Sequence, residues 1–370
     1  MTRFKLYIPG PVDVDDEILQ EMSSPSLPHY GPVWMSIYDE TMDLLHRLYG
    51  TENEMFLMPG PGSAGMESAI ASIVPPGKPI CVITNGFFGN RLVTIAEHHG
   101  ARPVKVASAW GQTIDLDAIR DTLRRKPDCR AVAMVHHETS TGILNPLAEV
   151  AAIAHEFDLP LIVDAISSLG GVPLPVDKWK IDVCVTVPNK ALECPPGVAI
   201  LSVSDRAWQK IEANTTSSAG WYLNLAVWRE AATNPLRRYP FLTTQPTQNI
   251  MAMRIALRRI FETGLEAHLA RFTRTAGQVR AGMQALGFAL FVQPPARLCP
   301  LITAFRPPAG TTPGDLIAYL YEKADILIAG GIAQLSDQIV RIGHMGKATT
   351  DPYTQTLLDQ VSAFVHAHQS

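Results

Sequence analysis

Cysteine is scarce in this sequence, and its pattern excludes two classes of site. The five cysteines are scattered over 370 residues, with no CxxC pair and no short Cys/His cluster; they stand at positions 81, 129, 184, 194 and 299. An odd, scattered set of this kind is unlike a disulfide framework or a zinc site of short ligand spacing. We therefore expect no metal and a reducing, cytoplasmic location.

The sequence also lacks a large excess of charge of one sign, and it lacks long hydrophobic runs. Thirty-one Lys and Arg stand against 35 Asp and Glu, a net charge of −4, so no basic field would attract nucleic acid or an acidic membrane. No run approaches the ~18 to 20 apolar residues that cross a bilayer. The opening MTRFKLYIPGPVDVDDE lacks the apolar segment of a secretory signal. We expect a soluble intracellular protein that binds neither nucleic acid nor membrane.

Between residues 54 and 204 the sequence alternates short apolar runs with helical patterns. This alternation predicts an α/β fold with a mostly parallel sheet covered by helices on both faces. The expected strands are 79–84, 131–135, 161–164, 182–187 and 198–202, and the expected helices are 63–74, 90–99, 116–125 and 147–157.

From residue 249 the pattern changes to two long helices and a second, smaller set of elements. We predict helices over 249–264, 265–286 and 313–322 and strands over 325–328 and 339–342. The interpretation is an N-terminal segment (1–19) that crosses the surface, a large domain (20–262) and a small α+β domain (263–370).

The segment PGPGSAGME contains a literal GxGxxG in Gly60, Gly62 and Gly65. A dinucleotide site also needs an acidic residue after the next strand, but that strand ends in Thr84 and is followed by Asn and Gly. The free N–H groups at the start of the following helix favour a single phosphate instead. The alternative is a tight strand-to-helix turn with Ser63 as its N-cap.

Two charged residues follow predicted strands, at the edge where parallel sheets bind ligands. Asp164 ends the apolar run LIVD, where a carboxylate needs a cation or several donors; it could face a protonated ring nitrogen or cap the next loop. Lys190 lies in the proline-rich loop PNKALECPPG; a partly desolvated lysine there can form a Schiff base, whereas most loop lysines are solvated charges. A phosphate loop, an acid and a lysine in this order are the set that pyridoxal phosphate requires.

The ordered motifs of the chain resemble the class V aminotransferases of pyridoxal-phosphate fold type I, in the alanine/serine–glyoxylate branch. The resemblance extends over nearly the whole sequence. It is carried by PGP near the start, HYGP (29–32), GSAGME, NGFFGNR (85–91), HHETSTG (136–142), VDAISSLGG (163–171), PNKALECPPG (188–197), YLNLAVW (222–228) and RIGHMG near the C-terminus.

The resemblance implies a role for each matching residue. Lys190 would be the Schiff-base lysine and Asp164 the partner of the pyridine nitrogen, while Arg341 would bind the substrate carboxylate. The remaining implied positions are Phe88 (stacked on the cofactor), Thr139 (near its ring hydroxyl), Gly62, Ser63 and Asn189 (phosphate), Ile166 (cofactor), Tyr30 (substrate) and Thr244 (phosphate, from the second subunit of a homodimer). Judged without the family, Arg341 would be a surface or domain-interface ion pair.

The implied function is an aminotransferase that moves an amino group from a small amino acid of the alanine or serine type to glyoxylate or pyruvate by a ping-pong mechanism. HYGP, HHETSTG and RIGHMG also resemble pyridoxamine–pyruvate aminotransferase, which uses free pyridoxamine. Pro61 and Ile332 depart from that enzyme and favour ordinary cofactor use, although Pro61 and Phe241 each remove a phosphate contact common in the family. The intact Lys190 and Asp164 disfavour a non-catalytic binding protein, and no cysteine lies in a mobile glycine-rich loop of the desulfurase kind.

Overall fold

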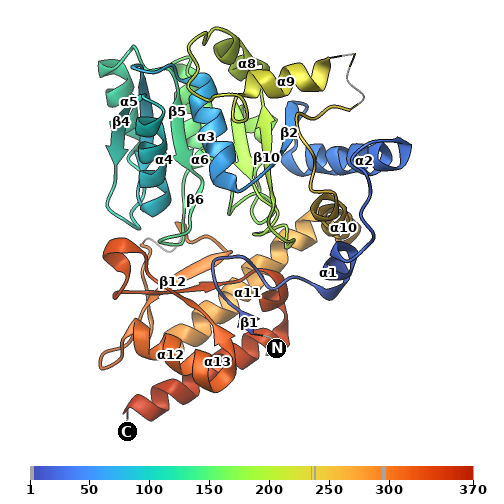
Figure 1. Ribbon diagram of the computed structural model, residues 1–370. Helices are drawn as coiled ribbons and strands as arrows, with labels where there is room; N and C mark the ends of the chain where they lie inside the picture. The colour runs from blue at the N-terminus through green and yellow to red at the C-terminus, as the bar shows by residue number, and fades with distance from the viewer. Residues whose placement is uncertain (1–3, 235, 237–238, 294–296, 370) are drawn as a thin grey trace.

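A seven-stranded mixed sheet forms the centre of the larger part of the molecule (Figure 1). The computed structural model describes residues 4–234, 236, 239–293 and 297–369. The strands lie in the order β2 (Glu54–Pro59), β10 (Val198–Val203), β9 (Val183–Thr186), β8 (Leu161–Asp164), β5 (Val132–Val135), β3 (Pro79–Thr84) and β4 (Arg102–Ala107). β10 is antiparallel to both of its neighbours, and the pairs from β9 to β4 are parallel, so the prediction of a mostly parallel sheet is confirmed.

Both faces of this sheet are buried, because successive side chains of a strand point to opposite faces. In β2, Met55 and Leu57 join one hydrophobic cluster, and Phe56 and Met58 join another. The first cluster is covered by α2 (Pro32–Tyr49), α5 (Leu116–Arg125), α6 (Leu147–Glu156) and α10 (Thr247–Thr263), and the second by α3 (Gly62–Ile73), α4 (Phe87–His98), α8 (Asp205–Glu212) and α9 (Leu225–Thr233).

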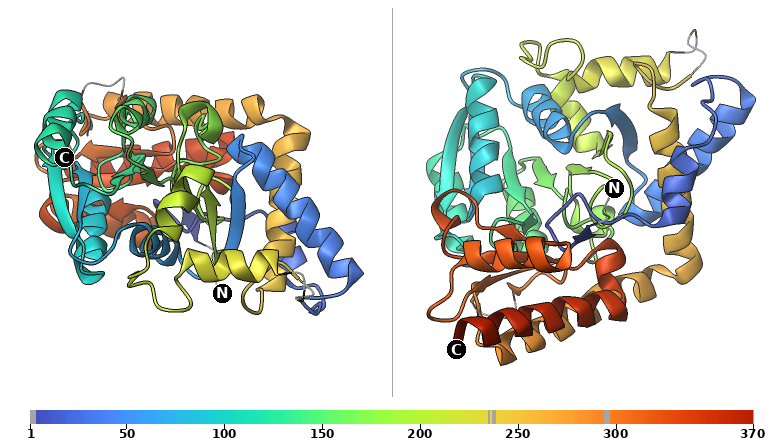
Figure 2. Two further views of the ribbon diagram at one scale, coloured as in Figure 1. Left: turned by 90° about the horizontal axis from the view of Figure 1, so that it is seen from above. Right: turned by 60° about the horizontal axis from the view of Figure 1, so that its bottom comes forward.

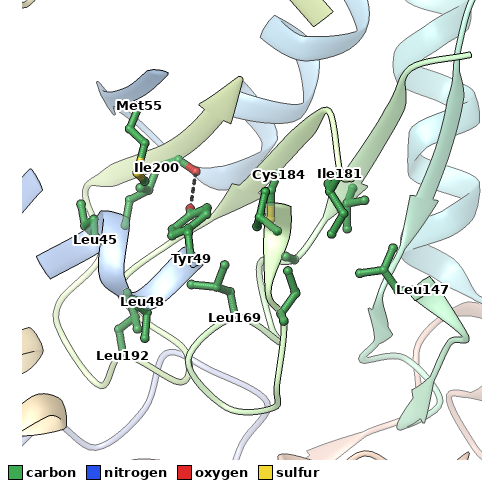
Figure 3. Close-up of a cluster of buried hydrophobic side chains, with 14 of the residues drawn as sticks. Leu45, Leu48, Tyr49, Met55, Leu147, Leu169, Ile181, Cys184, Leu192 and Ile200 are labelled. Atoms are coloured by element: carbon green, nitrogen blue, oxygen red, sulfur yellow. Dashed lines mark hydrogen bonds between the residues drawn. The ribbon is translucent and has the colours of Figure 1, made fainter. Parts of the chain in front are cut away.

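The end of α2 is tied to the sheet by a buried tyrosine (Figure 3). Tyr49 is fully buried in the first cluster, and its hydroxyl donates to the carbonyl of Ile200 on β10 at 3.0 Å. A buried hydroxyl without a partner would be costly, so this bond fixes the depth at which α2 packs.

The five strands predicted between residues 79 and 202 are all present within two residues of their expected ends. The large sheet contains two further strands, β2 and β4, that were not predicted. β2 (EMFLMP) contains no β-branched residue, and the edge strand β4 (RPVKVA) is largely solvent-facing, so neither has the usual signal of a buried strand. Helix α4 begins at Phe87, three residues before its expected start.

The C-terminal part contains a four-stranded antiparallel sheet, as the α+β prediction requires. Its order is β11 (Ala289–Leu290), β12 (Ile302–Arg306), β15 (Val340–Gly343) and β14 (Ala329–Gly330). A separate core forms between this sheet and α11 (Leu265–Ala285), α12 (Pro313–Ala324) and α13 (Asp351–Gln369); the last of these was not predicted. The proposed domain boundary at 262/263 falls one residue before the end of α10, just ahead of α11, and stays a prediction.

The N-terminal segment is built into the molecule, so the expectation that it only crosses the surface is wrong for its first described residues. β1 (Lys5–Leu6) pairs in parallel with β13 (Ile326–Leu327). Tyr7 is 1% exposed, and its carbonyl accepts from the N–H of Gly343 at 2.6 Å. We call residues 5–13 the N-terminal strap; Figure 2 shows the chain running on from it toward α1 (Asp16–Met22).

In the part of the chain that the structure describes, no helix is both long enough and apolar enough to cross a membrane.

Candidate active site

A cavity of about 240 Å³ lies at the edge of the large sheet where β5, β8 and β9 end and where α3 and α4 begin. Its lining includes every predicted cofactor position except Thr244, although these positions are spread over more than 120 residues of sequence. They are Gly62, Ser63, Phe88, Thr139, Asp164, Ile166, Asn189 and Lys190. The carboxyl edge of the parallel strands is where open α/β sheets bind ligands.

Helix α3 offers this cavity an uncapped N-terminus. The helix begins at Gly62 and its N-cap is Pro61, which makes no side-chain capping bond, so the alternative of Ser63 as the N-cap is wrong. The N–H groups of Gly62 and Ser63 therefore belong to the first turn, where helix starts bind anions. A Cβ at Gly62 would lie 2.5 Å from Ile166 Cδ1, so only glycine lets α3 begin this close to the residues after β8.

Asp164 ends β8 with its carboxylate nearly enclosed. It is 8% exposed, and Oδ1 accepts the N–H of Ile166 at 3.0 Å, so the expected loop cap occupies one of its two oxygens. Burial raises the pKa of Asp164 to about 7, against the opposing effect of that hydrogen bond. A buried carboxylate of this kind is stabilised by a cation, and a protonated ring nitrogen fits that need.

Lys190 is partly buried and held at its amine. Its Nζ donates to the carbonyl of Pro9 in the N-terminal strap at 2.6 Å. Burial and, to a smaller extent, the charge of Arg341 lower the pKa of Lys190 to about 8, with Asp164 opposing both. Lys190 is therefore not the solvated loop lysine of the alternative interpretation.

The strap approaches this lysine closely at one glycine. Gly10 has a φ of +122°, and a Cβ at this position would lie 2.5 Å from Lys190 Nζ. Both the backbone conformation and the lack of space favour glycine here. The strap thus covers the lysine with backbone alone.

Arg341 belongs to the small sheet and does not itself line the cavity, but it bonds to Thr139, which does. This arginine lies on β15, is 7% exposed, and donates from Nε to the carbonyl of Gly330 at 2.8 Å and from Nη1 to the carbonyl of Thr139 at 3.1 Å. Burial lowers the pKa of Arg341 to about 10, with Glu138 opposing. Among the described residues no acidic side chain pairs with Arg341, so the surface ion-pair interpretation is wrong.

Besides Arg341, two predicted residues do not line the cavity of their own chain. Tyr30 is 53% exposed and stacks on Tyr239, with ring centroids 6.3 Å apart. Thr244 is exposed in the loop before α10. Their predicted roles stay predictions.

The lining residues that were not predicted include two with titratable side chains, His137 and Arg91. His137 is buried; its Nδ1 lies 3.1 Å from the carbonyl of Ser167 and so carries the proton, while Nε2 has no partner among the described residues. Burial lowers the pKa of His137 to about 4, so the ring is a neutral acceptor. Arg91 lies over the Phe88 ring, 4.7 Å from its centroid. Both residues stand in motifs quoted above, but no local pattern indicates which side chains of a motif reach a cavity.

Comparison with known proteins agrees with this geometry. The family model described as aminotransferase class-V matches residues 19–351. An uncharacterized aminotransferase of Methanocaldococcus jannaschii is 35% identical over 342 residues, which cover 92% of this chain and 87% of the relative. The pyridoxamine–pyruvate transaminase of Mesorhizobium japonicum is 28% identical over 358 residues, or 97% and 90% of the two chains.

A solved structure extends the comparison to three dimensions. The alanine–glyoxylate aminotransferase of a Nostoc species superimposes with a TM-score of 0.93 at 29% identity, over 99% of this chain and 96% of that one. The similarity therefore includes both sheets and the strap between them.

Proposed function

Because the chain belongs to the class V aminotransferases, we propose that it holds pyridoxal phosphate on Lys190 and moves an amino group from a small amino acid to glyoxylate or pyruvate. One observation carries this proposal: Lys190, Asp164 and the uncapped start of α3 line a single cavity, with Arg341 beside Lys190. The donor groups present fit the three parts of the cofactor, which are an aldehyde, a protonatable ring nitrogen and a phosphate.

Each side chain has a definite task in this mechanism. The backbone N–H groups of Gly62 and Ser63 bind the phosphate. The Asp164 carboxylate would hold a proton on the ring nitrogen, and the Phe88 ring, which lines the same cavity, would pack against the cofactor. Bound pyridoxal phosphate supplies an electron sink for the bond that breaks at the substrate α-carbon.

Lys190 carries the proton. Its Nζ would hold the cofactor, and as a free amine it would move a proton between the substrate α-carbon and the cofactor carbon. Its lowered pKa leaves much of the amine neutral near pH 8, which a base requires. The strap keeps bulk water from this amine on one side, since Gly10 and Pro9 lie directly against it.

Arg341 binds the carboxylate that donor and acceptor share. A guanidinium presents parallel donors that match a carboxylate, and its burial strengthens the interaction. Because Nη1 also bonds the carbonyl of Thr139, the arginine is fixed to a residue that lines the cavity and would place the substrate carboxylate relative to it.

The test is a set of single half-reactions. Purified protein should show the visible absorbance of bound pyridoxal phosphate, and a small amino acid such as alanine or serine should convert it to the pyridoxamine form. Glyoxylate or pyruvate should then restore the spectrum. The proposal would be contradicted if the spectrum of protein loaded with pyridoxal phosphate did not change with any amino acid of a panel.

A second candidate is transfer from free pyridoxamine to pyruvate, the activity named for the Mesorhizobium japonicum relative. An enzyme that releases free pyridoxal gains nothing from a phosphate site, whereas α3 begins at the cavity without a side-chain cap. We expect pyridoxamine plus pyruvate in cofactor-free protein to react more slowly than alanine or serine plus glyoxylate in loaded protein. The reverse order would favour the second candidate.

We also propose a homodimer in the cytoplasm. In a homodimer, the exposed residues Tyr30 and Thr244 would contribute to the partner subunit's site. The five cysteines are all free and buried, which suits a reducing compartment. Light scattering on fully active protein should give about twice the 40.4 kDa of one chain. A mass near one chain would count against the dimer.

A further inference from the structure

The first turn of α4 is held by side chains that come about 50 residues later in the sequence. The Phe87 N–H donates to Ser140 Oγ at 3.0 Å. The Phe88 N–H donates to Glu138 Oε1 at 3.3 Å, and the Gly89 N–H donates to Glu138 Oε2 at 2.9 Å. The N–H groups that a helix start normally leaves free are thus satisfied here by a glutamate at the end of β6 (His137–Glu138) and a serine in the turn that leads from β6 to β7 (Ile143–Leu144).

The Glu138 carboxylate is fully buried and compensated by donors. Besides the two α4 N–H groups, its Oε1 accepts the Ser140 N–H at 3.1 Å and the Ser140 hydroxyl at 2.5 Å. The positive end of the α4 dipole adds to these bonds. Burial raises the pKa of Glu138, and the hydrogen bonds from Ser140, Gly89 and Phe88 oppose that rise.

The space for this carboxylate is left by a glycine. A Cβ at Gly86 would lie 2.3 Å from Glu138 Cγ and Cδ and 2.6 Å from Ser140 Oγ. Gly86 is the N-cap of α4 and makes no side-chain capping bond. A helix start with no cap of its own therefore stands against a buried acid that serves as one.

Three proposed site residues depend on this junction, which we call the Glu138–Ser140 clamp. Phe88 lies on the clamped turn, and Thr139 lies between the two clamp residues; both line the cavity. The Thr139 carbonyl in turn accepts from Arg341 at 3.1 Å. A shift of the clamp would move the ring that covers the cofactor, the hydroxyl beside it and the arginine that binds the substrate.

We propose that Glu138 is a positioning residue whose carboxylate fixes Phe88 and Thr139 against the bound cofactor. The proposal rests on the proposed function, because Phe88 and Thr139 receive their tasks there. Glu138 touches neither cofactor nor substrate; it acts through the backbone of α4 and of its own turn.

The test uses full-length protein and two graded substitutions. Glu138→Gln keeps the shape but places an NH₂ group against N–H donors, and Ser140→Ala removes one acceptor and one donor. Asp115→Ala is the matched control, because Asp115 caps α5 by accepting the N–H groups of Asp117 and Ala118, and its residues do not line the cavity. The readouts are the dissociation constant for pyridoxal phosphate, the visible circular dichroism of the bound cofactor, and hydrogen exchange of residues 87–89 in cofactor-free protein.

We expect Glu138→Gln to weaken cofactor binding at least tenfold, to reduce the visible circular dichroism, and to speed exchange at 87–89. Ser140→Ala should do the same to a smaller extent, and Asp115→Ala should leave all three unchanged while lowering Tm. Cofactor affinity and dichroism within twofold of wild type in a folded Glu138→Gln protein would overturn the proposal. If Glu138→Gln does not fold, Ser140→Ala decides by the same criteria. Wild-type protein that binds no pyridoxal phosphate would overturn the proposed function itself, and the inference with it.

Discussion

The large-sheet side and the small-sheet side of the site differ in the groups that they supply. The large-sheet side consists of groups at strand ends and at a helix start: Asp164 ends β8, Lys190 follows β9, and α3 begins at Gly62. On the small-sheet side, Arg341 on β15 lies next to the cavity lining and is fixed by the carbonyls of Gly330 and Thr139. We infer that the first side serves the cofactor and the second side serves the substrate carboxylate.

This difference has a practical meaning for mutagenesis. Where an anion is bound by backbone N–H groups, removing a side chain changes little, whereas a site made by one guanidinium is lost with it. Lys190 is influenced by both sides, since Arg341 lowers its pKa and Asp164 raises it. Substitutions on the two sides should therefore separate cofactor binding from substrate binding.

Lys190→Ala should have the largest effect, because it removes the covalent link and the proton carrier together. General acid–base groups contribute about 10² to 10⁴ in rate, and we expect turnover to fall at least ~1,000-fold with loss of the visible absorbance. Exposed Lys178→Ala is the control. Turnover within tenfold of wild type would remove Lys190 from the mechanism.

Arg341→Ala should break the substrate side while sparing the cofactor side. Losing a buried charged partner of a carboxylate costs about 2 to 4 kcal/mol in kcat/KM for both donor and acceptor. The cofactor spectrum should stay intact, and Arg306→Ala on the neighbouring strand β12 should change neither quantity. Loss of the cofactor in Arg341→Ala would show that the two anion sites have been exchanged in our assignment.

Asp164→Asn should break the cofactor side alone. A charge-assisted bond to the ring nitrogen is worth about 1.5 to 3 kcal/mol, so cofactor retention and α-proton removal should weaken together. Asp182→Asn is the matched control, since Asp182 is an equally buried carboxylate paired with Arg206 at 3.0 Å near the start of β9. That control should lower Tm without altering the cofactor. Unchanged α-proton exchange in Asp164→Asn would give the electron-sink role to another residue.

The two sides should also titrate apart. The amine of Lys190 has a pKa of about 8 and reacts only when neutral, so cofactor attachment to cofactor-free protein should speed up as the pH rises, about tenfold per unit below 8, and level off above it. The pKa of Arg341 is about 10, so carboxylate binding should not change up to pH 9. Stopped-flow attachment rates and inhibition by a simple carboxylate measure the two. A rate that is flat from pH 6 to 9 would contradict the first expectation.

Ser63→Ala should have the smallest effect, about 1 kcal/mol or less in cofactor binding, because the backbone N–H remains. Ser63→Pro removes that N–H at a first-turn position where proline is tolerated. Equilibrium titration with pyridoxal phosphate should show a much larger loss in Ser63→Pro at similar Tm. Equal losses in the two variants would mean that the hydroxyl, not the backbone, binds the phosphate.

Much of this cavity could be predicted from sequence, because strand ends carry a local signal. Asp164 and Lys190 follow apolar runs whose parallel arrangement places them at one edge, and the resemblance supplied Phe88 and Arg341. The sequence indicates an N-cap for α3 two residues too late, since a proline has no side-chain acceptor and gives no capping signal.

The remaining features depend on contacts between distant segments. The start of α4 was placed three residues late because its cap is supplied by Glu138 and Ser140 rather than by a neighbour. The sequence does not indicate that the strap is built into the fold, because its pairing strand, β13, lies more than 300 residues away. No pattern within a window of residues contains that information.

The strap also determines the order in which parts of the protein can fold during synthesis. Leu6 pairs with Leu327, and a ribosome adds about 5 to 20 residues per second, so roughly 16 to 64 s separate their synthesis. By the time β10 emerges the large sheet is complete, yet the segment that covers Lys190 has nothing to dock on. We expect the nascent chain to present an open lysine to pyridoxal phosphate during this interval and to close over it only when the last quarter of the chain arrives.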